Sequence, residues 1–284
     1  MKFSLILATV NRDKEVKEFL TSISQQIYTN FEVIIVDQNN DNRVLKILPY
    51  FKKLDIKYIK SEKGLSKARN RGLKEAYGDI VGFPDDDCLY PKELLENINI
   101  FFKEHNYDIL MGKTIDKETG GVVAGKNITK AQILKPSLIL GSSTTLFIKR
   151  DKKNIVFDEY FGIGAKFNAE EENDLLFRLL KKGHIGYYIP DINYVYHPPS
   201  DLDYTNTIRA KQRAIGLGAF IAKHIYTKEG IIYFFKYNVL RPFLGTILYI
   251  LRFDFVKSKY YFNRWLGIWQ GFFKYLRVKY ETDI

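Results

Sequence analysis

Two dense clusters of carboxylates are the residues best suited to chemistry in this sequence. The first, Asp85, Asp86 and Asp87, follows the apolar run 80–83 across a corner at Pro84. Three adjacent carboxylates repel one another unless cations compensate them. Asp85 and Asp87 can point to the same side, where such oxygen ligands suit Mg²⁺ or Mn²⁺ with a substrate diphosphate completing the shell. The alternative is a solvated acidic turn before a helix.

The second cluster opens the amphipathic segment 169–180. Carboxylates at the start of a helix are stabilised by its dipole, and we favour this explanation for Glu170. A helix that starts at a cleft can also aim one carboxylate at a reaction centre, where it accepts a proton from an attacking hydroxyl. The glycine-rich run 162–165 just before it fits a loop on the acceptor side or a plain connection equally well. The acids concerned are Glu170, Glu171, Glu172 and Asp174.

The front of the chain alternates between patterns typical of strands and of helices. This alternation predicts an α/β fold: a mostly parallel sheet, joined by crossovers, with helices on both faces. In such sheets ligands bind beyond the carboxyl ends of the strands. The apolar runs 3–8, 31–36, 56–59 and 79–83 predict strands, and the spacing of apolar residues within 13–23, 44–48 and 64–76 predicts helices.

Polar residues follow three of these predicted strands. They are the segments 9–12 (Thr-Val-Asn-Arg), 37–40 (Asp-Gln-Asn-Asn) and 85–87. Because parallel neighbours end at one edge of a sheet, we expect these three segments to converge there.

Composition excludes several classes of protein. The 284 residues are 46% hydrophobic and 27% charged, which is ordinary for a globular chain and excludes wholesale disorder. The one cysteine, Cys88, excludes a disulfide framework and a cysteine-built zinc site, and suits a reducing compartment. The apolar start 1–8 is too short for a signal peptide. No apolar run of 18 residues occurs, so we expect no simple spanning helix.

Charge divides the chain near Tyr204. Of the net charge of +11, residues 205–284 carry 14 Lys and Arg against 4 acids, whereas residues 1–204 are nearly balanced. A uniformly basic nucleic-acid binder would not have this distribution. We therefore predict a catalytic domain over 1–204 and a separate basic, aromatic region over 205–284, and no nucleic-acid partner.

The basic region is predicted to be helical and to lie on a membrane. The segment 231–251 is apolar but is interrupted by charges and a proline, so it suits an interface better than a span. Within 257–279 one helical face is aromatic, and rings beside Lys and Arg suit the headgroups of an anionic bilayer. The alternative is a helical subdomain that packs on the core or on a second protomer, as a homodimer. The residues of that face are Tyr261, Trp265, Ile268, Trp269, Phe272 and Leu276.

The order of these motifs resembles the inverting family 2 glycosyltransferases, which have the GT-A fold. The resemblance covers roughly residues 3–200 and rests on four ordered pieces. Each piece alone is weak, and their order and spacing together carry the resemblance. The pieces are the opening strand with 8–12, the strand 31–37, the pair 64–73 and 78–87, and the segment 171–175 with Arg178, Leu179 and Gly183.

The resemblance assigns the donor site residue by residue. Thr9 and Asn11 match the first nucleotide-contacting loop, and Asp37 matches the strand-end acid near the base and ribose. Gln38 stands where the family commonly has a second acid, which leaves the nucleotide open. Arg69 and Asn70 match the segment near the diphosphate, where a guanidinium suits phosphate geometry, or else form an ordinary solvated helix face. Asp86 is grouped with these nucleotide-sugar contacts.

The resemblance also assigns the metal, the base and the acceptor side. Asp85 and Asp87 match the metal-binding Asp-x-Asp, with His197 as a further ligand or a structural histidine. Glu172 matches the catalytic base, usually Asp in the family, and Glu171 is the alternative. The acceptor side is assigned to Ser142, Ser143 and Asp174, although Asp174 could instead stabilise its helix.

These assignments imply a reaction and its partners. A divalent metal and Arg69 would stabilise the departing nucleoside diphosphate, while Glu172 deprotonates an acceptor hydroxyl that attacks with inversion. The donor would be a nucleotide-diphospho-sugar, the acceptor a saccharide or lipid-linked saccharide, and the location the cytoplasmic face of the cell membrane. Two rivals remain: a sugar nucleotidyltransferase, which should have a glycine-rich phosphate loop after its first strand, and a non-catalytic membrane-surface or nucleic-acid-binding protein. Metal-dependent binding of a nucleoside diphosphate separates the enzymes from the last.

Overall fold

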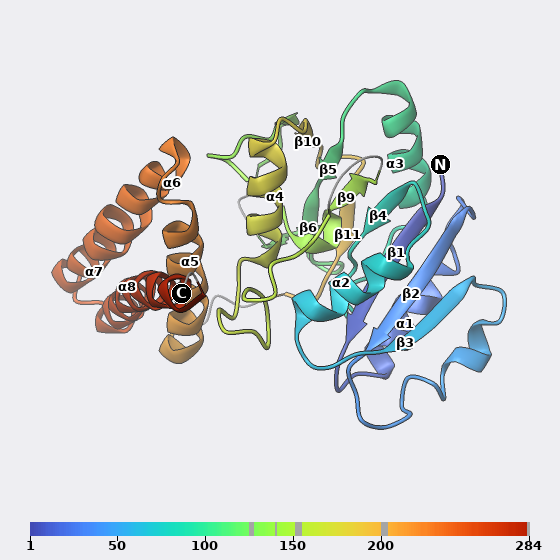
Figure 1. Ribbon diagram of the computed structural model, residues 1–284, viewed down its shortest axis with the longest axis horizontal. Helices are drawn as coiled ribbons and strands as arrows, with labels where there is room; N and C mark the ends of the chain where they lie inside the picture. Colours follow the sequence, from blue (N-terminus) through green and yellow to red (C-terminus); the bar gives the residue numbers. More distant parts are fainter. Residues whose placement is uncertain (125–127, 140, 151–154, 200–203, 283–284) are drawn as a thin grey trace. The chain divides into compact units, whose positions relative to one another are not determined.

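A computed structural model describes residues 1–124, 128–139, 141–150, 155–199 and 204–282 (Figure 1). The strands are β1 (Phe3–Thr9), β2 (Phe31–Asp37), β3 (Ile56–Lys60), β4 (Ile80–Gly82), β5 (Ile109–Met111), β6 (Lys113–Ile115), β7 (Val122–Ala124), β8 (Gln132–Ile133), β9 (Phe147–Lys149), β10 (Gly186–Tyr188) and β11 (Tyr194–Tyr196). The α-helices are α1 (Lys14–Ile23), α2 (Leu65–Glu75), α3 (Leu94–Glu104), α4 (Glu171–Lys181), α5 (Thr207–His224), α6 (Lys228–Tyr233), α7 (Arg241–Leu251) and α8 (Phe255–Thr282). Two 3₁₀ helices, η1 (Leu48–Phe51) and η2 (Ser143–Thr145), and a π-helix, η3 (Phe234–Leu240), complete the elements.

The chain forms two compact units. The first comprises residues 1–157 and 175–200, and the second comprises residues 158–174 and 201–284. The loop before α4 and the first turn of that helix therefore belong with the C-terminal helices. The chain also passes between units at 200/201, whereas the division predicted from charge lies near Tyr204.

The first unit is built on a sheet of eight strands in the order β3-β2-β1-β4-β9-β5-β10-β8 (Figure 1). Strands β3, β2, β1 and β4 are parallel, while β9 is antiparallel to both β4 and β5. Apolar side chains fill both faces: α1 and α3 pack on one, and α2 with the later part of α4 on the other. A second sheet has the order β11-β6-β7. The predicted GT-A architecture, a mostly parallel sheet between helices, is confirmed.

Two local predictions need correction. The segment 44–48 does not form an α-helix: it makes turns and then η1, which has a proline in its first turn. Pro49 lacks the N–H that a longer helix needs, while Val44 and Ile47 still reach the core. Several strands beyond residue 105 went unpredicted because segments of two or three residues carry too little periodicity to detect.

Helices α5 to α8 make up most of the second unit (orange to red in Figure 1). Helices α5 and α8 approach closely at glycines. A Cβ at Gly218 would lie 1.9 Å from the Ile268 carbonyl oxygen, and one at Gly271 would lie 2.0 Å from that of Ile215. Glycine is therefore required at both positions to let the two backbones meet. In the part of the chain that the structure describes, no helix is both long and apolar enough to cross a membrane.

The aromatic face of α8, which was predicted to meet a membrane, packs in part against other helices of its own unit. Ile268 is fully buried, and the Trp269 ring lies edge-on to Phe234 of η3 at 5.6 Å. The Tyr261 ring stacks on Tyr249 of α7 at 5.4 Å. Ile268 is the one fully buried residue of this face and the other five are half-buried, so the stripe contributes to packing between helices, and its contact with a membrane stays a prediction.

Candidate active site

The strand ends meet as predicted. Thr9 at the end of β1 lies directly opposite Asp37 at the end of β2, and β4 pairs with the other side of β1. The Thr9 hydroxyl donates a hydrogen bond of 2.7 Å to Asp86 Oδ2, which ties the first strand end to the acid cluster. Both side chains are buried. The cluster is thus held by the edge of the sheet and does not form a free solvated turn.

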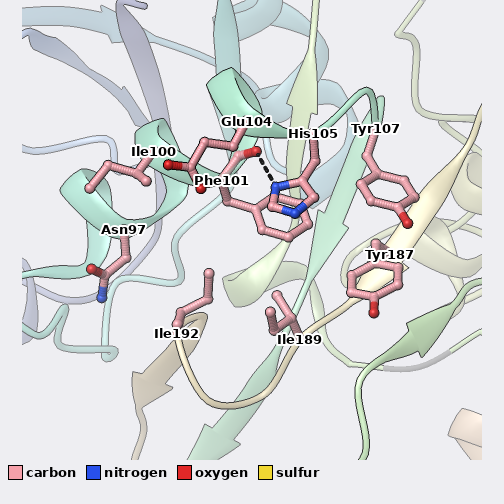
Figure 2. Close-up of a pocket in the computed structure, with 9 residues that line it drawn as sticks. All are labelled: Asn97, Ile100, Phe101, Glu104, His105, Tyr107, Tyr187, Ile189 and Ile192. Carbon is pink, nitrogen blue, oxygen red and sulfur yellow. Dashed lines mark hydrogen bonds between the residues drawn. The ribbon is translucent and has the colours of Figure 1, made fainter.

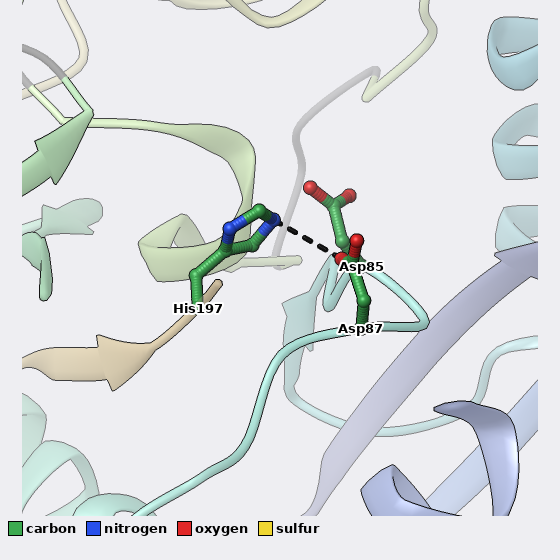
Figure 3. Close-up of side chains that lie close together, drawn as sticks. All are labelled: Asp85, Asp87 and His197. Atoms are coloured by element: carbon green, nitrogen blue, oxygen red, sulfur yellow. Dashed lines mark ion pairs between the residues drawn. The ribbon is translucent and has the colours of Figure 1, made fainter. Parts of the chain in front are cut away.

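Asp85, Asp87 and His197 form a group of possible metal ligands (Figure 3). Each offers one ligand atom, and these three atoms lie within 4.8 Å of one another. His197 follows β11 and places its Nε2 3.1 Å from Asp87 Oδ1, while its Nδ1 lies 2.7 Å from the Pro198 carbonyl oxygen. Two carboxylates and one imidazole are donors that Mn²⁺ accepts, so the residues fit a divalent metal with positions left for a ligand.

Cations of the chain compensate the acid cluster. The Arg12 guanidinium lies 2.7 Å from Asp86 and 2.5 Å from Asp87. Burial alone would raise the pKa of Asp87, but the contacts with His197 and Arg12 outweigh it and hold that pKa at about 2. For Asp86, burial prevails over Thr9 and Arg12 and raises the pKa. Burial lowers the pKa of His197, and the contact with Asp87 more than reverses this.

Arg69 reaches the same cluster from α2. Its side chain is 1% exposed, and its Nη2 donates to Asp85 Oδ1 at 3.1 Å and to Ser143 Oγ at 2.9 Å. The guanidinium lies over the rings of Phe83 and Phe157. This packing fixes the arginine beside one metal-ligand candidate and joins it to the segment assigned to the acceptor side.

Asp37 is fully buried and strongly engaged. Its two oxygens accept hydrogen bonds from the Tyr58 hydroxyl, the Lys60 ammonium and the backbone and side chain of Asn39. Burial acts to raise the pKa of Asp37, and these donors together lower it below its ordinary value. An ionised carboxylate therefore stands at the end of β2.

Three residues assigned to the donor site are occupied by internal bonds. Gln38 accepts from the Gly64 amide at 2.7 Å and donates to the Thr9 carbonyl, so its amide links strand ends and does not present a free base-pairing edge. Asn70 bonds both the N–H and the carbonyl of Phe157. Asn11, at φ 60°, offers its backbone N–H to Asn39. For Gln38 and Asn70 these contacts indicate a positioning role.

The second acidic cluster, residues 170–174, lies in the second unit. Glu171 is buried, Glu172 is half-buried, and both lie in the first turn of α4. Asp174 is fully buried, with His224 Nε2 at 2.9 Å and Lys223 Nζ at 2.7 Å from its Oδ1. Burial beside two basic groups favours the helix-stabilising role for Asp174 over contact with an acceptor.

The remaining assigned residue, Ser142, caps η2. Its hydroxyl lies 2.7 Å from the Thr144 hydroxyl and also accepts from the Thr144 amide. Ser142 is half-buried and Ser143 is buried beside Arg69. Both serines therefore shape the segment before β9, in the first unit.

A separate cavity of about 380 Å³ lies between α3 and the end of β10 (Figure 2). A ladder of stacked rings lines one side, with Tyr107 and Tyr187 at 4.7 Å and Phe101 and His105 at 4.5 Å. It contains none of the residues assigned from the sequence. The acid cluster, and not this cavity, carries the chemistry considered below.

Sequence reasoning missed several participants. Arg12 lies in the strand-end segment 9–12. An arginine directly before a helix at that edge could have indicated a cation beside the acid cluster. Tyr58 and Lys60 alternate with apolar residues in β3, a pattern that any edge strand shows. Lys223 lies 2.6 Å from Asp158 and is mostly buried. Only the fold reveals these last three.

Comparison with known proteins finds glycosyltransferases. Over 119 residues the chain is 39% identical to the poly(ribitol-phosphate) β-N-acetylglucosaminyltransferase TarS of Staphylococcus aureus, covering 40% of this chain and 21% of TarS. It is 32% identical over 142 residues to the UDP-Glc:α-D-GlcNAc-diphosphoundecaprenol β-1,3-glucosyltransferase WfgD of Escherichia coli, covering 46% of this chain and 54% of WfgD. The chain thus spans about a fifth to a half of the length of these relatives.

Solved structures share the fold. A crystal structure of TarS residues 1–349 superposes with a TM-score of 0.62 at 19% identity, covering 91% of this chain and 89% of that one. The mannosyltransferase PcManGT of Pyrobaculum calidifontis, in complex with GDP-Man and Mn²⁺, has a TM-score of 0.65 at 15% identity and covers 94% and 87%. Residues 4–172, more than half of the chain, match the description "Glycosyl transferase family 2", and the chain belongs to that family.

Proposed function

We propose that the protein transfers a sugar from a nucleotide-diphospho-sugar to a hydroxyl of a saccharide acceptor, with inversion and with the help of a divalent metal. The observation that carries this proposal is the grouping of Asp85, Asp87 and His197 at the edge of the sheet, backed by Arg12 and Arg69. The complex of PcManGT with GDP-Man and Mn²⁺ supports a metal at a site of this fold.

Each named residue has one task in the proposed reaction. A metal bound by Asp85, Asp87 and His197 would supply positive charge where a departing diphosphate accumulates negative charge. Arg69 holds Asp85 in place and adds a guanidinium beside it. Thr9 and Arg12 orient Asp86 and Asp87. Asp37 and Gln38 keep the end of β2 in the form that a nucleoside would meet.

Glu172 is proposed as the general base. Its carboxylate takes the proton of the acceptor hydroxyl as that oxygen forms a bond to the anomeric carbon. The bond from the anomeric carbon to the diphosphate oxygen breaks on the opposite side, and its electron pair leaves with the nucleoside diphosphate. Attack and departure on opposite faces invert the anomeric centre.

We further propose that the acceptor is carried on a lipid and that the protein works at the cytoplasmic face of the membrane. WfgD, a relative, acts by its name on a diphosphoundecaprenol-linked sugar. The net charge of +10 over residues 205–284, from 14 basic and 4 acidic residues, supports attraction to anionic lipid.

The test is a screen of nucleotide-sugars with Mn²⁺, with and without saccharide acceptors, that measures released nucleoside diphosphate. We expect one donor to give release that stops when the metal is chelated. Proton NMR of the transferred sugar then reports its anomeric configuration. A product that retains the donor's configuration contradicts the single displacement, and release that persists fully in chelator contradicts the metal.

A further inference from the structure

The turn between α7 and α8 carries four apolar side chains that stand largely in solvent. Leu251 is 72% exposed, Phe253 is 82%, Phe255 is 65% and Val256 is 52%. We call these four residues the apolar tip. The turn joins the two labelled helices α7 and α8 in Figure 1. Scattered single apolar residues are normal on a surface, whereas four within six positions at one turn need an explanation.

The turn is built firmly and holds Phe253 outward. Phe253 has φ 56°, in the left-handed region that bulky side chains rarely adopt. Its N–H donates to the Ile250 carbonyl, and the Asp254 N–H donates to that of Tyr249, each at 2.9 Å. Asp254 Oδ1 then accepts from the Lys257 amide at the start of α8. The N–H groups of Phe253 and Asp254 make the two hydrogen bonds with which a helix commonly ends at a left-handed residue, so the exposed phenylalanine belongs to a defined turn.

The apolar surface continues from the tip along α7. Leu244, Ile247, Leu248 and Leu251 follow one another at the spacing of one helical face, and all are at least 41% exposed. Aromatic rings extend this surface onto α8, since Phe243 and Phe262 both lie about 6 Å from Trp265. The surface therefore continues over both helices, and Trp265, a half-buried residue of the aromatic face described above, lies at its border.

Basic side chains flank the apolar tip. Arg252 stands between Leu251 and Phe253 in the sequence, Lys259 lies one turn beyond Phe255, and both are exposed. The Lys257 ammonium is paired with Asp254 at 2.9 Å, so the one acid of the turn is already neutralised. An apolar projection flanked by two exposed cations, Arg252 and Lys259, complements a bilayer with anionic headgroups, where aromatic rings enter the acyl boundary and ammonium or guanidinium groups meet phosphates.

We propose that the apolar tip inserts into the interface of an anionic membrane and is the membrane-docking surface of the protein. This inference deepens the proposed membrane location and uses none of the proposed transfer chemistry. Helix α7 has 11 residues, which at about 1.5 Å per residue reach roughly half of a hydrocarbon core of about 30 Å. The tip is thus suited to shallow insertion and not to a span.

A second copy of the chain is the less suitable occupant. In a symmetric dimer the same patch meets itself, so Arg252 and Lys259 of the two copies would approach one another. Like charges removed from water oppose such a contact, whereas lipid phosphates favour it. We therefore make the dimer an outcome of the test.

The first experiment measures binding of the full chain to phosphatidylcholine vesicles prepared with and without phosphatidylglycerol. We expect the chain to bind the anionic vesicles. Salt at 1 M should weaken this binding, because it shortens the electrostatic screening length to about 3 Å. The triple variant L251S/F253S/F255S should lower the partition coefficient by roughly tenfold or more, because it removes three exposed apolar groups. The control Ile208→Ser, which changes a residue of α5 that is 72% exposed, should bind as wild type does.

The second experiment follows the tip itself. The chain has one cysteine, Cys88, which is fully buried, so Phe253→Cys can be labelled alone with a polarity-sensitive dye. We expect its emission to shift to the blue with anionic vesicles and to be quenched by lipids labelled near the headgroup. The same dye on Ile208→Cys should not respond.

Three results would overturn the proposal. One is wild-type binding by the triple variant, another is a dye at position 253 that stays in water on bound protein, and the third is a dimer that dissociates in the triple variant without any vesicle effect. Nucleoside diphosphate binding, measured on the same samples, separates this failure from that of the proposed function. A variant that loses vesicles but keeps nucleotide supports the tip, and loss of both indicates misfolding, which the thermal melt of each variant detects. If the triple variant misfolds, the vesicle binding of the single variant Phe253→Ser is measured in its place. Binding equal to that of wild type by a folded Phe253→Ser overturns the proposal.

Discussion

Arg12 Nη1 lies 2.5 Å from Asp87 Oδ2 and bridges to Asp86, so a cation of the chain itself lies against two of the three adjacent aspartates. Three carboxylates in sequence repel one another, and in the fold Arg12, His197 and Arg69 compensate their negative charge. A divalent metal would compensate the same charge. The stability of the site should therefore depend on which cations are present.

Replacing Arg12 with Met should destabilise the metal-free protein. Because the Arg12 side chain is 39% exposed and solvent screens its pairs, we expect a loss of only about 1 kcal/mol in the free energy of unfolding. Urea unfolding in chelator and in Mn²⁺ measures it, and Mn²⁺ should recover part of the loss. Arg43→Met, which breaks an exposed pair with Asp41 outside the cluster, is the matched control. An equal loss with and without Mn²⁺ would contradict the shared compensation.

Asp87→Asn should weaken both Mn²⁺ and nucleoside diphosphate binding while the fold is kept. The change removes one candidate ligand and the partner of His197, and we expect Mn²⁺ affinity to fall on the order of 100-fold or more. Isothermal titration calorimetry checks this, with Asp41→Asn as a control on an exposed acid. If the Asp87 variant binds metal and nucleotide as wild type does, the metal site lies elsewhere.

The sequence was sufficient to predict the parallel strands and the acid cluster at their ends. It was not sufficient to predict the side-chain hydrogen bonds that connect them. Long strands such as β1 and β2 can be predicted from their continuous apolar composition. Their parallel pairing then brings Thr9 opposite Asp37. The contacts of Arg69 with Ser143 and of Gln38 with Gly64 join residues tens of positions apart. No local pattern encodes such pairs, because they depend on how crossovers place the loops.

The tail shows a different limit. Hydrophobic periodicity identified α8 and its aromatic face, but periodicity cannot say whether a partner is lipid or another helix. The glycines of α5 and α8 account for part of this face, since Gly218 and Gly271 allow a backbone approach that covers Ile268. Exposed apolar residues lie on α7 and its turn, and Phe262 and Phe273 of α8 are exposed as well.

Glu172→Gln should keep donor binding and lower turnover by a factor on the order of 10²–10⁴, the usual contribution of a positioned general base. Glu171→Gln, one residue earlier and buried, should cost much less in turnover. Steady-state rates with donor and acceptor, together with the donor dissociation constant, separate chemistry from binding. Near-normal turnover in the Glu172 variant with loss in the Glu171 variant would move the base by one residue.

The contribution of Asp37 to stability should depend on pH. Since its pKa in the folded protein lies below that in the unfolded chain, its stabilisation is complete above the unfolded value of about 3.9 and is lost as pH falls through the folded value. Asp37→Asn should therefore cost about 1–3 kcal/mol near pH 7, and less below pH 4, relative to wild type. Urea unfolding across this range gives the difference. A cost that does not change with pH would mean that geometry, and not charge, accounts for it.

Gly218→Ala should disrupt the packing of α5 on α8. Alanine favours a helix over glycine by about 1 kcal/mol, but its Cβ would lie 1.9 Å from the Ile268 carbonyl oxygen, so the helices must separate. We expect a net loss of about 1–3 kcal/mol, the usual cost of overpacking. Hydrogen exchange should then accelerate at the amides of α5 and α8. Gly121→Ala is the control, because the nearest atom to its added Cβ is the Thr119 side-chain hydroxyl oxygen at 3.2 Å, and that side chain can move aside. If Gly218→Ala unfolds and exchanges as wild type does, the close approach of the two helices is not what holds the aromatic face of α8 inside the unit.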